Sequence, residues 1–346
     1  MTPFRIGAFG IAAGQRKTVE LPISVLANHT PISLPVHVIN GAKPGPTFFI
    51  SGVVHGDEML GVEIMRLVVV HTAVKGLAGT LLAVPIVNTF GFLNHSRYMP
   101  DRRDLNRSFP GSDHGSLASL LADLFMKEVV RRSQYGIDLH TAALHRTNLP
   151  QIRIAPDEPE LLKMAKLFAP PVILISKLRE GTLRQCARDQ GIKVMLYEAG
   201  EALRFDEVAI ETGVTGILRV MASLKMITLA PHSESHHQTA ISLSSTWLRA
   251  PEGGVLRPRL ENRVYLLTSY PDGTPAETTI TGNIVPASLK TDASGVAIVT
   301  ISAGVDPVTL NLQATDLQGK TAKAALRLEA KAQADSLIPR TCLLYT

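Results

Sequence analysis

Apolar and polar residues alternate in blocks along the first 228 residues, and the blocks predict strands and helices in turn. Compact apolar runs over residues 47–54 and 80–87 predict buried strands. Apolar residues at helical spacing over 58–70 and 117–132 predict helices. Strands that alternate with helices are typical of an α/β fold with a largely parallel sheet. Ligands bind at the carboxyl ends of the strands in such sheets, so functional residues are expected there.

The pattern changes after residue 228. Residues 229–246 are polar and are predicted to be a linker or crossing segment. Their histidines, His232, His236 and His237, are interpreted as part of a solvated stretch, with a metal-binding group as the alternative. Residues 247–346 are predicted to form a β-rich domain. Its five apolar runs are separated by Gly- and Asp-containing turns, which is typical of an all-β sandwich. The segments PDGTP, LKTDASGVA and ATDLQGK resemble an immunoglobulin-like module of bacterial surface proteins.

Composition narrows the function classes. The 346 residues are enough for two domains, and 35 Lys and Arg against 30 Asp and Glu give a formal net charge of +5. These charges are dispersed, and aromatic residues make up only 5% of the chain, which argues against a nucleic-acid-binding protein. No apolar run is long enough to predict a membrane span.

Cysteine usage constrains the compartment and the type of metal site. Cys186 and Cys342 are too few for a disulfide framework or a thiolate zinc site. We therefore expect a reduced, cytoplasmic protein. The cell envelope is the alternative if the C-terminal module is immunoglobulin-like.

Candidate metal ligands follow two of the predicted strands. His55 and Glu58 come directly after the buried strand ending at Val54, and His140 closes a short strand with Asp138. Two imidazoles and a carboxylate with an open fourth position are the pattern of a catalytic zinc. Taken alone, the His55–Glu58 spacing is also typical of a helix N-terminus that carries an acid for the helix dipole.

Further polar residues extend this pattern. Asn106 and Arg107 lie side by side after a basic stretch and offer amide and guanidinium donors for a carboxylate. Glu198 follows an apolar strand over 194–196 and precedes a glycine turn. It is a candidate general base, although an ordinary surface glutamate would fit the same pattern.

Taken together, the motifs HGDE, RY, DLNRSFPG, DLHTA and YEAGE, in this order, resemble those of the succinylglutamate desuccinylase/aspartoacylase family. This family is a branch of the zinc carboxypeptidase-like hydrolases, and the resemblance covers roughly residues 1–258. It implies a mixed, mainly parallel sheet flanked by helices, followed by a C-terminal β domain. It also implies hydrolysis of a small amide, most simply the deacylation of an N-acyl amino acid.

The resemblance assigns a role to each matching residue. His55, Glu58 and His140 would hold one Zn²⁺ per chain, and Asp104 and Asp138 would orient the two histidines. Glu198 would activate the metal-bound water and later pass its proton to the leaving amine. The family's carbonyl-polarising arginine matches Arg97, with Arg102 and Arg103 as competitors for that role. Asn106 and Arg107 would hold the carboxylate of a small anionic substrate resembling an N-acyl amino acid.

The chain departs from the family beyond residue 260, where the immunoglobulin-like segments replace the expected continuation of the β domain. Two alternatives to a deacylase follow. One is a carboxypeptidase-like hydrolase of peptides, including cell-wall peptides. The other is a non-catalytic protein whose β module docks a partner.

Overall fold

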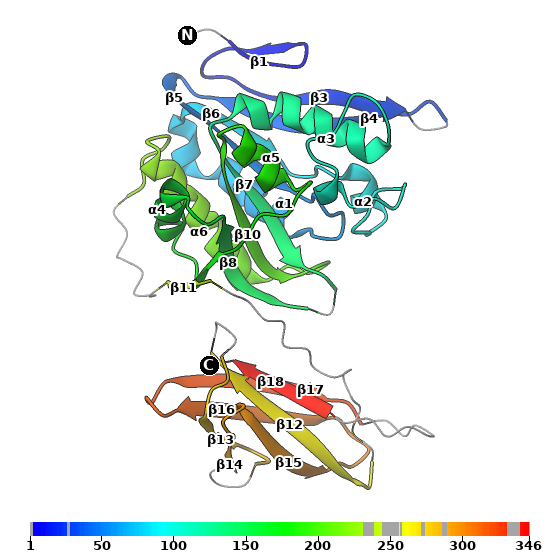
Figure 1. Cartoon of the computed structure of the whole chain (residues 1–346), viewed down its shortest axis with the longest axis vertical. Helices are drawn as coiled ribbons and strands as arrows, with labels where there is room; N and C mark the ends of the chain where they lie inside the picture. Colours follow the sequence, from blue (N-terminus) through cyan, green and yellow to red (C-terminus); the bar gives the residue numbers. More distant parts are fainter. Residues whose placement is uncertain are drawn as a thin grey trace. The chain divides into compact units, whose positions relative to one another are not determined.

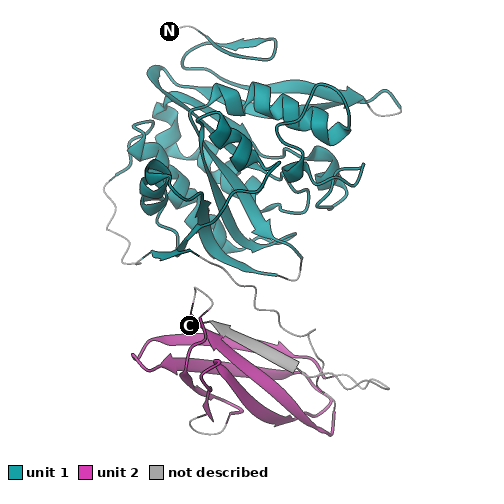
Figure 2. Ribbon diagram, viewed as in Figure 1, with its two compact units in different colours: residues 1–243 teal, residues 244–346 magenta. Residues whose placement is uncertain are grey.

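The computed structural model of the chain describes residues 3–25, 28–144, 146–230, 239–243, 256, 258–270, 274–285, 289–330 and 340–345. The chain divides into two compact units, residues 1–243 and 244–346 (Figure 2). The candidate metal ligands all belong to the first unit.

A nine-stranded sheet forms the centre of the first unit (Figure 1). Its strands, in the order in which they lie side by side, are β11 (Ala240–Ser242), β9 (Val172–Ile175), β8 (Asn148–Ile154), β10 (Lys193–Glu201), β7 (Tyr135–Ala142), β5 (Lys43–Gly52), β6 (Ala78–Val84), β4 (Pro31–Asn40) and β3 (Arg16–Val25). Neighbours are parallel from β11 to β8 and from β10 to β6, and antiparallel elsewhere. The predicted mixed, mainly parallel sheet is therefore confirmed.

Helices cover both faces of this sheet. One face packs against α1 (Leu60–Val70), α4 (Pro159–Phe168) and α6 (Glu207–Ser223). The other packs against α3 (Leu117–Glu128), α5 (Leu183–Asp189) and the hairpin of β1 (Phe4–Ile6) and β2 (Phe9–Ile11). The short α2 (Thr89–Leu93) and three 3₁₀ turns, η1 (Thr72–Gly76), η2 (Leu105–Arg107) and η3 (Val130–Arg132), complete the unit. Within the described residues, no helix has both the length and the apolar character needed to cross a bilayer.

The turn between β5 and α1 carries two of the candidate ligands. The predicted strand over 47–54 stops at Gly52, because Val53 adopts a left-handed backbone conformation with φ of 55°. The predicted helix over 58–70 begins only at Leu60. Gly56 packs against α2 so closely that a Cβ there would lie 2.0 Å from a backbone carbon. The turn is therefore held against its surroundings, and its glycine allows that approach.

The second unit is made of two sheets. One contains β15 (Val296–Ser302), β12 (Glu261–Ser269) and β18 (Arg340–Tyr345), and the other β14 (Leu289–Lys290), β13 (Thr278–Gly282), β16 (Val308–Asp316) and β17 (Thr321–Leu328). Inward-facing residues such as Leu266, Ile280, Val299 and Leu310 share one apolar core. The predicted all-β character is confirmed, with β14 and β18 added to the five predicted strands. The immunoglobulin-like resemblance stays a prediction.

The segment predicted as a linker contributes to the first unit. Within residues 229–246, β11 pairs in parallel with β9 and extends the sheet by one strand. The first unit thus runs to residue 243, past the boundary expected at 228. His232, His236 and His237 lie outside the described residues.

Candidate metal centre

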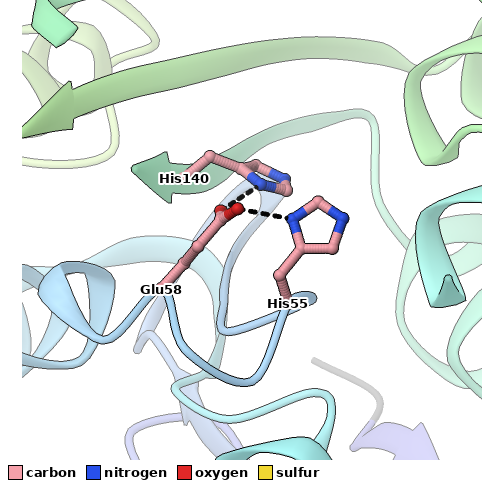
Figure 3. A group of neighbouring side chains, drawn as sticks. All are labelled: His55, Glu58 and His140. Atoms are coloured by element: carbon pink, nitrogen blue, oxygen red, sulfur yellow. Dashed lines mark hydrogen bonds and ion pairs between the residues drawn. The ribbon is translucent and has the colours of Figure 1, made fainter. Parts of the chain in front are cut away.

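Two neighbouring strands bring the three candidate ligands together. His55 and Glu58 lie in the turn after β5, and His140 lies near the end of β7, which is parallel to β5 in the sheet. Glu58 Oε1 is 2.7 Å from Nδ1 of His55, and Glu58 Oε2 is 2.7 Å from Nδ1 of His140 (Figure 3). All three side chains are buried, and their ligand atoms lie within 4.8 Å of one another. One ion could therefore contact all three.

Each imidazole is also held from its other side by an aspartate. His55 Nε2 lies 3.1 Å from Oδ1 of Asp104, and His140 Nε2 lies 2.7 Å from Oδ2 of Asp138. The hydroxyl of Ser51 donates to Asp138 Oδ1 at 2.7 Å. With Nε2–H donated to a carboxylate, each ring keeps the Nδ1 lone pair for a metal, as metal-bound histidines require.

The charges of this cluster perturb one another strongly. Burial opposes the charged form of Glu58, but the two histidines outweigh it and hold the pKa of Glu58 well below its usual range. Burial likewise opposes protonation of His55 and His140. Nearby carboxylates, Asp138 and Glu58 for His140 and chiefly Glu58 for His55, outweigh burial and raise the pKa of both rings. The cluster therefore favours positive charge at the position of the two Nδ1 atoms.

This donor set fits a zinc ion. Nitrogen and carboxylate oxygen are ligands that zinc prefers, and three protein ligands leave a position open for water or substrate. The hydrogen-bonded network holds three carboxylates and the guanidinium of Arg97. With both imidazoles neutral, these groups leave a net charge of −2, which a dication would balance.

Of the three candidate arginines, Arg97 alone contacts the cluster within the described residues. Its Nη1 donates to Glu58 Oε1 and its Nη2 to Asp104 Oδ2, both at 3.1 Å. Arg103 is exposed and faces Asp101 at 3.7 Å. Arg102 is also exposed and has a left-handed backbone conformation. The catalytic role of Arg97 stays a prediction, but its place beside Glu58 suits it.

The predicted carboxylate-binding pair lies on η2, immediately after Asp104. Asn106 is buried, and its Oδ1 accepts from the backbone N–H of Leu183, which joins η2 to the start of α5. Its NH₂ group is therefore the part suited to a substrate carboxylate. Arg107 is exposed, and burial of part of its side chain, with positive charge from Arg179 and Arg97, lowers its pKa.

Glu198 lies inside β10 and not at the predicted strand end. The strand runs on to Glu201 through an irregular register at Gly200, whose φ is 66°. Glu198 is the register partner of His140 on β7, so the two side chains lie on the same face of the sheet. The structure thus brings the candidate base next to a candidate ligand.

Sequence reasoning missed two residues that contact this group. Ser51 is the register partner of Asp138 and fixes its carboxylate from within β5. Arg153 of β8 forms an ion pair with Glu198, with Nε 3.0 Å from Oε2. The available signal for Arg153 was a polar residue at every second position of an otherwise largely apolar segment, Gln151 and Arg153. His145, five residues after His140, lies outside the described residues.

Comparison with known proteins relates the chain to a family. Residues 44–224 match the model of the succinylglutamate desuccinylase/aspartoacylase catalytic domain. The N-alpha-acetyl-L-2,4-diaminobutyric acid deacetylase of Halomonas elongata is 29% identical over 172 residues, which cover 48% of this chain and 50% of that protein. The match therefore spans about half the length of the curated relative.

Solved structures share the fold. The product-bound ectoine utilization protein EutE (DoeB) of Ruegeria pomeroyi has a TM-score of 0.61 and 18% identity, covering 91% of this chain and 92% of its own. A succinylglutamate desuccinylase/aspartoacylase from Rhodobacter sphaeroides has a TM-score of 0.61 and 20% identity, covering 92% and 96%. At these identities the likeness concerns the fold. The family model, however, matches just over half of the 346 residues, and the chain belongs to the succinylglutamate desuccinylase/aspartoacylase family.

Proposed function

We propose that the protein is a zinc-dependent hydrolase that deacylates a small N-acyl amino acid. The observation that carries the proposal is the convergence of His55, Glu58 and His140 on one point, with Glu198 on the adjacent strand. Family membership and a relative named as a deacetylase support the same reaction class.

The metal and the protein side chains divide the chemistry. A zinc ion held by the three ligands would polarise the scissile carbonyl and lower the pKa of a water to about 7. Glu198 accepts the proton of the attacking water and delivers it to the nitrogen of the leaving amine. This transfer completes cleavage of the C–N bond, with the acid and the free amine as products.

Arg97 stabilises the negative charge that develops on the carbonyl oxygen. A guanidinium has five N–H donors, and its contacts to Glu58 and Asp104 leave donors for a third partner. A charge fixed in this way before the reaction needs no reorganisation when the oxyanion forms.

Asn106 and Arg107 hold the substrate carboxylate. The amide NH₂ and the guanidinium lie on one 3₁₀ turn directly after Asp104, which itself orients His55. A bound carboxylate therefore sits at a fixed distance from the metal position, which restricts where the acyl carbon can lie. This arrangement favours small amides whose amine half is an amino acid.

The decisive experiment combines metal analysis with a panel of N-acetyl, N-succinyl and longer N-acyl amino acids. Glu198→Gln should retain zinc and lose turnover, because an amide cannot accept the proton. Glu201→Gln is the matched control, since Glu201 is on the same strand, equally buried and paired with Arg204 at 3.0 Å. Full turnover by Glu198→Gln at full zinc occupancy would refute the mechanism.

A short-peptide panel tests the alternative function. Faster cleavage of extended peptides than of N-acyl amino acids would assign a carboxypeptidase-like activity to the same site. Protein that binds no zinc and cleaves neither panel would instead favour a binding role.

A further inference from the structure

One face of β8 carries polar residues beside the candidate base. Gln151 is the register partner of Glu198, and Arg153 is the partner of Leu196, so both point to the same face of the sheet as Glu198. The alternate residues of β8, Ile152 and Ile154, are buried in the core on the other face. The sequence therefore places a guanidinium diagonally opposite Glu198, within reach of a long side chain.

The two side chains form an ion pair without a hydrogen bond, since Arg153 Nε has no hydrogen-bond partner among the described residues. Arg153 Nε lies 3.0 Å from Glu198 Oε2, and the side chains are 25% and 15% exposed. This partial shielding from water makes the pair stronger than an exposed ion pair. Oε2 is the Glu198 oxygen nearest the guanidinium, whose charge attracts the carboxylate from that side.

A second arginine restricts the alternatives open to Arg153. Burial lowers the pKa of Arg184, on α5, to about 10, and the nearby charge of Arg153 contributes to this shift. Nη1 of Arg184 is buried and has no hydrogen-bond partner among the described residues. Two like charges repel, so a rotation of Arg153 toward Arg184 is unfavourable and the orientation toward Glu198 is favoured.

We infer that Arg153 is a positioning residue for the general base: its charge attracts the Glu198 carboxylate from the side of Oε2 and so orients it to accept the proton of the attacking water. The inference rests on the proposed function, because it needs Glu198 to act as the base. Arg153 is not itself assigned a contact with the substrate.

The expected effect follows from the sensitivity of proton transfer to geometry. A displacement of about 1 Å in a reacting group can cost ~10²-fold in rate. Arg153→Met keeps much of the apolar stem and removes the ion pair, so we expect kcat to fall by about 10- to 100-fold with KM unchanged. Arg153→Lys keeps the charge without the fork of donors, and should restore part of the loss.

The test compares Arg153→Met, Arg153→Lys, Glu198→Gln and the double variant Arg153→Met/Glu198→Gln in the full-length zinc-loaded protein. Arg66→Met is the control, because Arg66 pairs with Glu63 on the exposed side of α1. Zinc content and the melting temperature are recorded for each variant. If Arg153→Met does not fold, Arg153→Lys replaces it in the test, and its kcat should lie below that of the wild-type protein.

Support requires a lower kcat at constant KM and zinc content, partial rescue by lysine, and no further loss when Arg153→Met is added to Glu198→Gln. A raised KM with kcat retained would overturn the inference and make Arg153 a substrate-binding residue. The inference would also be overturned if Arg153→Met lowered kcat in the Glu198→Gln background by the same factor as in the wild-type protein. An active Glu198→Gln enzyme would refute the proposed function itself, whereas an inactive one beside a fully active Arg153→Met would refute this inference alone.

Discussion

Replacement of Asp138 by asparagine would separate the charge of this carboxylate from its hydrogen bonds. Asp138 is fully buried and accepts from two sides, from Ser51 Oγ at 2.7 Å and from His140 Nε2 at 2.7 Å. Asparagine has nearly the same shape and can keep its oxygen toward the histidine. Its NH₂ group then faces Ser51, whose hydroxyl can turn and act as the acceptor. The variant therefore keeps both contacts and loses the negative charge.

The loss should appear in zinc affinity. Outer partners of metal-bound histidines are worth about 10- to 100-fold in metal affinity or activity, or about 1.4–2.7 kcal/mol. We expect Asp138→Asn to weaken zinc binding by this factor, measured by competition with a chromophoric chelator at fixed pH. Asp316→Asn is the control, because Asp316 is also buried but accepts turn N–H groups in the second unit. Wild-type zinc affinity in a folded Asp138→Asn protein would refute the charge argument.

Three further predictions concern stability. Gly56→Ala places a Cβ 2.0 Å from a backbone carbon of α2 and should lower the free energy of unfolding by about 1–3 kcal/mol. Gly76→Ala is the control, because a Cβ there meets open space, and urea unfolding of the two variants distinguishes them. Tyr197→Phe removes a buried hydrogen bond of 2.6 Å to the carbonyl of Ala209 and should cost about 1–3 kcal/mol in the same assay. Leu310→Ala should destabilise the second unit by about 2–5 kcal/mol, since Leu310 is fully buried in a core formed by residues of that unit alone. Zinc affinity should stay unchanged, and a drop in zinc affinity would contradict the prediction.

In the first unit, β5 and α1 were predicted from the sequence because of the pattern of their buried residues. β5 is buried from Phe48 to Gly52, and α1 buries residues at helical spacing, so both leave a clear pattern. β8 was not predicted, because Gln151 and Arg153 face a polar site and, together with Pro150 on the buried face, interrupt the apolar run. Its antiparallel pairing with β10 is likewise set by tertiary contacts.

The candidate ligands could be predicted because each lies near the end of a strand, and the order of the strands decides which strand ends meet. His55 and Glu58 are close in the sequence, whereas His140 joins them only because β7 lies next to β5. Asp104 and Asp138, which the family resemblance predicted as partners of the two histidines, form hydrogen bonds with His55 and His140. Ser51 and Arg153 could not be found in this way, since their roles depend on register, which the hydrophobic pattern of one strand does not determine.

The charge balance of the cluster explains why the ligands need their partners. Glu58, Asp104 and Asp138 crowd three negative charges around two imidazoles, and Arg97 neutralises only one of them. Protons on the imidazoles are one way to offset the rest, which is why nearby carboxylates raise the pKa of both rings despite burial. A single dication at the same point offsets the remaining charge while keeping both rings neutral. The same carboxylates that orient the histidines thus also favour a doubly charged ion over a singly charged one.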